Sequence, residues 1–140
     1  MILTDTNVLS EVLLLLPDPC VARWMSNVPR RQIWTCTIVV AELLTGIEVI
    51  PPGRKQAELA LAVHEMVARD FAGQILSFDL RAARQYAVIR AKRQKMGRPI
   101  KELDAQIAAI AAVHGATLAT RNARDFEDCG IKVINPWEAA

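Results

Sequence analysis

Cysteine and histidine are scarce in this 140-residue chain, which contains three cysteines and two histidines. The cysteines Cys20, Cys36 and Cys129 are far apart, odd in number and without CxxC spacing, which argues against a zinc site and a disulfide framework. We expect Cys36 and Cys129, which lie in apolar stretches, to be small core residues. No acidic cluster accompanies His64 or His114, so both are expected to be surface or packing residues. This cysteine usage fits a reducing cytosol, and a cytoplasmic protein is predicted.

Long apolar runs are also missing. The longest near the start, Val12 to Leu16, ends at Pro17 and is far shorter than the ~20 residues that a membrane span needs. No basic segment precedes the first apolar residues, so no signal peptide is expected. No glycine-rich turn follows the first predicted strand, which disfavours a nucleotide-binding Rossmann protein. Aromatic residues make up 5% of the chain and offer no clear platform for stacking bases.

The composition that remains is that of a folded domain. Hydrophobic residues make up 52% and charged residues 23% of the chain, enough to bury a core, and the length suits one domain over residues 1–140. The net charge of +2 identifies no partner by itself, so an argument for nucleic acid depends on where the charges lie.

Strands and helices alternate along the sequence. Short apolar runs predict strands at residues 2–4, 32–36, 75–78, 117–119 and 131–134. Apolar periodicity predicts helices at residues 8–16, 20–28, 38–50, 54–72, 79–96 and 102–114, with a helical turn at 125–127. Thr37 and Asp79 are expected to be N-caps, Gly115 a C-terminal cap, and residues 51–53 a corner between helices. We predict an α/β fold with a short, mostly parallel five-stranded sheet flanked by helices on both faces.

Four acidic residues fall at the ends of these strands. Asp5 directly follows the first strand, and Glu42 lies in the first turns of the helix after the second. Asp104 lies in the first turn of the helix before the fourth strand, and Asp125 follows that strand after a short loop. Because ligands bind at the carboxyl ends of parallel strands, we expect the four carboxylates to share one edge of the sheet.

Each acid has a structural explanation as well as a functional one. Asp5 suits a helix N-cap, Asp104 suits a helix N-terminus, and Glu42 has the option of an arginine partner. However, the helix around Glu42 is apolar on nearly every side, which predicts a buried carboxylate that needs a partner, a proton or a cation. The convergence of Asp5, Glu42 and Asp104 favours the functional explanation.

Several carboxylates in one pocket repel each other, and a bound hard divalent cation usually compensates this repulsion. Mg²⁺ and Mn²⁺ prefer oxygen ligands, generate hydroxide from water and stabilise charge on phosphoryl oxygens. We therefore expect Asp5, Glu42 and Asp104 to be metal ligands.

Four segments, "ILTDTNVLSE", "VVAELLTG", "LDAQIAAIAAVHG" and "LATRNARDFE", occur in this order, followed by "INPWE". Together they resemble the PIN-domain family, in particular the VapC-like toxins of type II toxin–antitoxin systems and their FitB-type subgroup. The resemblance extends from Ile2 to Glu138. It implies an endoribonuclease that uses Mg²⁺ or Mn²⁺, with a homodimeric assembly and a cognate antitoxin protein as partner.

The resemblance also implies roles for individual residues. Asp5, Glu42 and Asp104 match the three core catalytic acids, and Asp125 is a further candidate. The matching supporting polar positions are Thr6, Asn7, Thr120 and Arg121. The family usually offers a fourth acid in the loop after the fourth strand, where this chain has Asn122 directly after Arg121; we take Asn122 as a further supporting polar residue. Whether Asn122, Asp125 or neither completes the metal site is left open, and with it the number of metal ions.

A cluster of cations precedes Asp104. It places six basic residues within twelve positions: Arg90, Lys92, Arg93, Lys95, Arg98 and Lys101. Such a cluster is able to hold the RNA backbone, and Arg90, Arg93, Lys95, Arg98 and Lys101 are our candidate RNA contacts. The alternative is a solvated helix face whose cations favour the helix C-terminus.

Two other functions compete with the ribonuclease. A metal-dependent phosphatase of small molecules would also place an aspartate after the first strand. Against it, no second aspartate follows Asp5 two residues on, and no lysine clearly serves the pocket. A non-catalytic module that binds nucleic acid or a partner would predict loss of one core acid, and none is lost.

Overall fold

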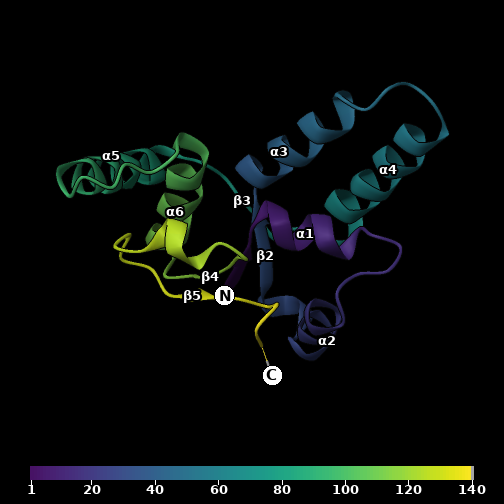
Figure 1. The fold of residues 1–140 in the computed structure, drawn as a ribbon, viewed down its shortest axis with the longest axis horizontal. Helices are drawn as coiled ribbons and strands as arrows, with labels where there is room; N and C mark the ends of the chain where they lie inside the picture. The colour runs from purple at the N-terminus through teal and green to yellow at the C-terminus, as the bar shows by residue number, and fades with distance from the viewer. Residues whose placement is uncertain (140) are drawn as a thin grey trace.

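The computed structural model describes residues 1–139 and contains a single five-stranded sheet with helices packed around it (Figure 1). Its elements follow one another in the order β1 (Ile2–Thr4), α1 (Thr6–Val12), α2 (Pro19–Asn27), η1 (Arg30–Gln32), β2 (Ile33–Cys36), α3 (Thr37–Glu48), α4 (Arg54–Glu65), η2 (Met66–Asp70), β3 (Ile75–Leu76), α5 (Leu80–Lys95), α6 (Glu102–His114), β4 (Thr117–Ala119), η3 (Ala123–Phe126) and β5 (Val133–Ile134).

The strand order is β3-β2-β1-β4-β5, and every neighbouring pair is parallel. The chain begins in the centre of the sheet, moves outward through β2 and β3, and then crosses back to β4 on the other side of β1. The point where this direction reverses, between β1 and β4, is where an open parallel sheet leaves a crevice beyond its carboxyl ends. The predicted α/β fold is confirmed, and the sheet is entirely parallel.

The same topology separates the helices into two groups. Connections between parallel strands are right-handed. The helices that connect β1 to β2 and β2 to β3 therefore lie on one face of the sheet, and the helices that connect β3 back to β4 lie on the other. Accordingly, α1 packs with α2 and α3, and α3 packs with α4, whereas α5 packs with α6 and α6 contacts β4. Figure 1 shows the two groups on opposite sides of the strands. Helices α3 and α6, one from each group, also contact each other.

The core is centred on β1, β4 and α6. Leu3 and Leu118 are completely buried in the two central strands, and Ile107 and Ile110 of α6 pack in the same cluster. Small residues let α6 approach the sheet closely, namely Ala105, Ala108, Ala109 and Ala111. Cys36 and Cys129 are buried in the core cluster, as predicted.

Several predicted boundaries are confirmed and others are wrong. Asp79 caps α5, since its Oδ1 accepts a hydrogen bond of 2.9 Å from the backbone N–H of Ala82. Gly115 ends α6 in the left-handed conformation with φ of 60°. Thr37 is not an N-cap: α3 starts at this residue, and Cys36 occupies the cap position without a side-chain bond.

The observed helices and strands differ most in length from the predicted ones where no neighbouring element buries the side chains. The helix predicted at residues 8–16 ends at Val12, and Leu15 is 97% exposed in the following turn. Pro17 disfavours helical geometry in the residue before it, so the run of leucines does not continue the helix. The helix predicted at 54–72 consists of α4 and the π-helical turn η2, and β3 and β5 are two-residue strands.

Throughout residues 1–139, no helix has both the length and the apolar character to cross a membrane.

Candidate active site

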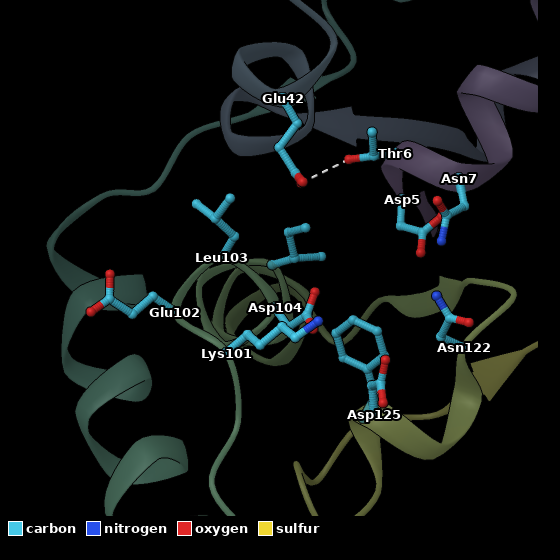
Figure 2. Close-up of a pocket in the computed structure, with 12 residues that line it drawn as sticks. Asp5, Thr6, Asn7, Glu42, Lys101, Glu102, Leu103, Asp104, Asn122 and Asp125 are labelled. Atoms are coloured by element: carbon cyan, nitrogen blue, oxygen red, sulfur yellow. Dashed lines mark hydrogen bonds between the residues drawn. The ribbon is translucent and has the colours of Figure 1, made fainter. Parts of the chain in front are cut away.

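A pocket of about 530 Å³ lies at the carboxyl edge of the sheet and brings the four predicted acids together (Figure 2). Asp5 comes from the end of β1, Glu42 from α3, Asp104 from α6 and Asp125 from η3. Its wall also includes Thr6, Asn7, Lys101, Glu102, Leu103, Ile107, Asn122 and Phe126. Residues separated by up to about 120 positions in the sequence therefore meet at the crevice that the strand order creates.

Asp5 is the most buried of the four, with 5% of its surface exposed. It is the N-cap of α1, and its Oδ1 accepts a hydrogen bond of 3.1 Å from the backbone N–H of Val8. Burial raises the pKa of Asp5 to about 6, although hydrogen bonds from Thr120 and from the backbone of Val8 and Asn7 oppose that rise. Asp5 thus has the capping role that its position suggested, and its side chain also lines the pocket.

Glu42 lies in a less buried setting than its sequence suggested. Helix α3 buries only Val39, Leu43 and Ile47, while Leu44 is 48% exposed, so the helix is amphipathic and not buried on all sides. The prediction that Glu42 is buried by apolar neighbours is wrong, because its side chain is half-buried at the rim of the pocket. The hydroxyl of Thr6 donates a hydrogen bond of 2.8 Å to its Oε1 and holds the carboxylate toward the pocket (Figure 2).

Asp104 lies in the first turn of α6 and is half-buried. Desolvation raises its pKa, and the negative charges of Asp125 and Glu42 raise it further, whereas the cations Lys101 and Arg93 lower it. Asp104 is thus close enough to the other two carboxylates for their charges to repel one another. The pocket holds negative charge that its own residues only partly compensate.

The loop after β4 forms the wall opposite Glu42. The completely buried Thr120 accepts a hydrogen bond of 3.1 Å from the backbone N–H of Asn122 at its hydroxyl, and Asn122 accepts one of 3.0 Å from the backbone of Asp125. The side chains of Asn122 and Asp125 both line the pocket. Either of them is therefore placed to complete a metal site.

The predicted supporting residues are divided by the structure. Thr6, Asn7 and Asn122 line the pocket. Thr120 does not line it, but it is hydrogen-bonded to Asp5 and to the backbone N–H of Asn122. Arg121 does not line it, because its guanidinium lies over the ring of Trp137, 5.1 Å from the centroid.

The candidate RNA contacts also differ in their exposure and in the contacts that they already make. Lys101 lines the pocket, so the argument against a phosphatase from a missing lysine was wrong. Arg93 is 5% exposed and its guanidinium binds backbone carbonyls, so its assignment as an RNA contact is wrong. Arg98 forms ion pairs with two acidic side chains, and Arg90 lies over the ring of Tyr86. Among the described residues, Lys95 and Lys101 are the candidates that stay exposed without an ion pair or a ring contact.

The pocket's chemistry fits a hard divalent cation. Its donors are carboxylate, amide and hydroxyl oxygens, the ligands that Mg²⁺ and Mn²⁺ prefer. Within residues 1–139, no three His, Cys, Asp or Glu side chains are gathered tightly enough to hold a metal ion as they stand. The carboxylates line one common space (Figure 2).

Sequence reasoning missed four residues that also line the pocket. They are Glu102, Leu103, Ile107 and Phe126. The internal role of Arg93 was missed as well, because its partners are backbone groups that leave no mark in the sequence pattern.

Comparison with known protein families matches residues 2–132 to the PIN domain. The chain belongs to the PIN-domain family. Three relatives of this PIN domain align over nearly the whole of both chains. They are a plasmid stability protein StbB of Pseudomonas syringae (41% identical, 99% of this chain and 100% of the relative), a VapC ribonuclease of Sinorhizobium fredii (38%, 100% of both) and the toxin FitB of Neisseria gonorrhoeae (37%, 98% and 99%).

Solved structures give the same result. A crystal structure of FitAcB from Neisseria gonorrhoeae has a chain 37% identical to this PIN domain, with a TM-score of 0.92 and 99% of both chains covered. A DNA-bound VapBC complex from Salmonella typhimurium shares the fold at 24% identity, with a TM-score of 0.81 and coverage of 96% and 97%. The expected resemblance to VapC-like and FitB-type proteins is confirmed.

Proposed function

We propose that the chain is a Mg²⁺- or Mn²⁺-dependent endoribonuclease and the toxin of a type II toxin–antitoxin pair. The observation that carries the proposal is the single pocket in which Asp5, Glu42, Asp104 and Asp125 meet from four separate elements of a PIN domain. A relative 38% identical over the whole chain is named a VapC ribonuclease, and another at 37% is named a toxin.

The residues of the pocket suit phosphodiester hydrolysis. Asp5, Glu42 and Asp104 would hold the cation, with Asn122 or Asp125 on the opposite wall. When bound, a divalent cation supplies an activated water for attack and stabilises negative charge on the phosphoryl oxygens. Thr6 orients Glu42 through its hydrogen bond, and Thr120 keeps Asp5 in place.

Lys101 would hold the substrate phosphate. It lies at the rim of the pocket, at the N-terminal end of α6, beside the acids that would hold the metal. A phosphate drawn into an acidic pocket needs a cation that is not already neutralised. No ion pair of Lys101 occurs within residues 1–139, so its ammonium is available for that contact.

The partner would be an antitoxin protein. Structural neighbours at 36% and 37% identity are complexes of FitB with FitA, one of them bound to a DNA fragment. The near-complete coverage of both chains supports the same kind of partner for this protein, and a homodimer belongs to the same proposal.

The test is cleavage of a mixed RNA pool by purified protein in Mg²⁺, in Mn²⁺ and in EDTA. Glu42→Gln keeps the shape of the side chain and removes its charge. Glu48→Gln is the matched control, since Glu48 is exposed on the same helix and outside the pocket. We expect metal-dependent cleavage that Glu42→Gln lacks and Glu48→Gln retains, with unchanged circular dichroism spectra.

Cleavage that survives in EDTA, or equally in both variants, contradicts the proposal. Absence of both cleavage and Mn²⁺ binding would favour the non-catalytic module, and hydrolysis of small phosphomonoesters without RNA cleavage would favour the phosphatase.

A further inference from the structure

Arg93 carries a buried charge and does not line the pocket. It lies in the last turn of α5, only 5% of its surface is exposed, and it is the one charged residue besides Asp5 that is buried within residues 1–139. Burying a charge is costly unless hydrogen bonds satisfy it. The contacts of the Arg93 guanidinium therefore show which groups compensate the cost of burying its charge.

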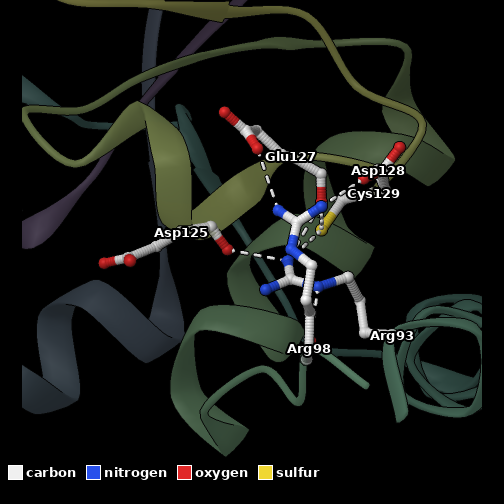
Figure 3. Close-up of polar contacts among 6 residues, drawn as sticks. All are labelled: Arg93, Arg98, Asp125, Glu127, Asp128 and Cys129. Carbon is white, nitrogen blue, oxygen red and sulfur yellow. Dashed lines mark hydrogen bonds and ion pairs between the residues drawn. The ribbon is translucent and has the colours of Figure 1, made fainter. Parts of the chain in front are cut away.

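The guanidinium of Arg93 joins two loops (Figure 3). Its Nε donates a hydrogen bond of 2.7 Å to the carbonyl oxygen of Arg98, in the loop between α5 and α6. Its Nη1 donates to the carbonyl oxygens of Asp125 at 2.9 Å and Glu127 at 3.0 Å, in η3 and just after it. The Sγ of Cys129 lies 3.6 Å from the same nitrogen.

Both loops lead into residues that line the pocket. The first continues into Lys101 and the turn of α6 that carries Asp104. The second carries Asp125 itself, whose carbonyl oxygen is bound to Arg93 while its side chain lines the pocket. Arg93 therefore joins the segment that leads to Asp104 with the segment that carries Asp125.

We propose that Arg93 is a positioning residue of the active site, whose guanidinium holds the α5–α6 loop and η3 at the separation that lets Asp104 and Asp125 face one cation. The inference rests on the proposed function and adds a residue outside the pocket to its machinery. The planar guanidinium supplies donors in two directions at once. A lysine at this position keeps the charge and presents its donors at a single point, so it is unable to span both loops.

Arg98 provides a matched control. Its side chain links the same two loops from outside, through Glu127 at 2.9 Å and Asp128 at 2.8 Å, and is 41% exposed. Exposed ion pairs contribute little to stability. Arg98→Lys leaves the backbone carbonyl that Arg93 binds in place, so it changes an arginine of the same region without breaking the internal link.

The experiment measures Mn²⁺ affinity by calorimetry and the free energy of unfolding in urea, on full-length protein without RNA. We expect Arg93→Lys to weaken Mn²⁺ binding about ten-fold or more, as does loss of other groups that orient metal ligands, and Arg98→Lys to change it less than two-fold. A purely fold-stabilising arginine would lower the free energy of unfolding and leave the Mn²⁺ affinity of the folded protein unchanged.

A second variant covers the case in which Arg93→Lys does not fold. Arg93→Gln removes the buried charge, which lowers the desolvation cost, and its amide reaches one loop only. The proposal is overturned if the Arg93 variant that folds binds Mn²⁺ within two-fold of wild type. It is also overturned if Arg98→Lys loses as much Mn²⁺ affinity as that variant. Wild-type protein that neither binds Mn²⁺ nor cleaves RNA contradicts the proposed function instead, so the two failures are distinguishable.

Discussion

The hydroxyl of Thr6 donates a hydrogen bond of 2.8 Å to Oε1 of Glu42, across 36 positions of sequence. The bond connects the first turn of α1, next to the N-cap Asp5, with the second turn of α3. A side-chain contact therefore connects the start of α1, directly after Asp5, with the part of α3 that carries Glu42.

Removal of this hydroxyl tests its importance. We expect Thr6→Val, which keeps the size of the side chain, to lower RNA cleavage about ten-fold through misorientation of Glu42, with a small change in stability. Thr45→Val is the control, because Thr45 lies on the exposed side of α3 and its hydroxyl bonds only to the carbonyl of Ala41. Steady-state cleavage rates and urea unfolding measure both effects. Equal losses of activity in the two variants would show that the Thr6–Glu42 bond is unimportant.

The burial of Asp5 predicts a pH dependence of stability. Its pKa is about 6 in the folded protein against an ordinary value of 3.8, so the folded state holds the proton more tightly than the unfolded state. Its stabilising contribution is complete below pH 4 and is lost as the pH rises through 6, by about 3 kcal/mol at about 1.4 kcal/mol per pKa unit. Asp5→Asn should therefore be more stable than wild type at pH 8 without metal.

Metal should reverse this order, because a cation binds the ionised carboxylate. Unfolding in urea at pH 5 and pH 8, with and without Mg²⁺, measures the effect. Mg²⁺ is expected to stabilise the wild type at pH 8 and to have little effect on Asp5→Asn. A wild type whose stability relative to Asp5→Asn is the same at both pH values would contradict the role of burial.

Lys101 and Lys95 should differ in their contribution to RNA binding. Lys101 lines the pocket, whereas Lys95 is exposed at the end of α5 and does not. We expect Lys101→Gln to weaken RNA binding and to reduce the salt slope by about one, as for one lost phosphate contact, and Lys95→Gln to have a smaller effect. Binding is measured in an Asp5→Asn background, where RNA stays intact. If Lys95→Gln weakens binding more, the RNA path lies along α5.

The sequence was sufficient to locate the edge of the sheet at which the acids meet. Alternating apolar strands and helices predict a parallel sheet, and the positions of Asp5, Asp104 and Asp125 relative to their strands place them at one end of it. This part succeeded because strand direction in a parallel sheet fixes which residues share an edge.

The burial of individual side chains was harder to predict. The apolar residues around Glu42 suggested a fully buried helix, but Leu44 and Val49 face outward because no element of residues 1–139 covers that side of α3. Arg93 was expected on the surface among neighbouring cations. Its acceptors are the backbone carbonyls of Arg98, Asp125 and Glu127, the last two more than 30 positions away. Backbone carbonyls are present at every residue whatever the sequence.

The most direct test of the metal site is the anomalous scattering of Mn²⁺ in crystals of the protein, because it locates the cation without reference to activity. We predict an anomalous difference peak in the pocket, with carboxylate oxygens of Asp5, Glu42 and Asp104 around it. We also predict that the peak disappears in Asp5→Asn. Mn²⁺-saturated, cleavage-competent protein with no peak in this pocket, or with its peak elsewhere, would contradict the assignment of these carboxylates as the metal site.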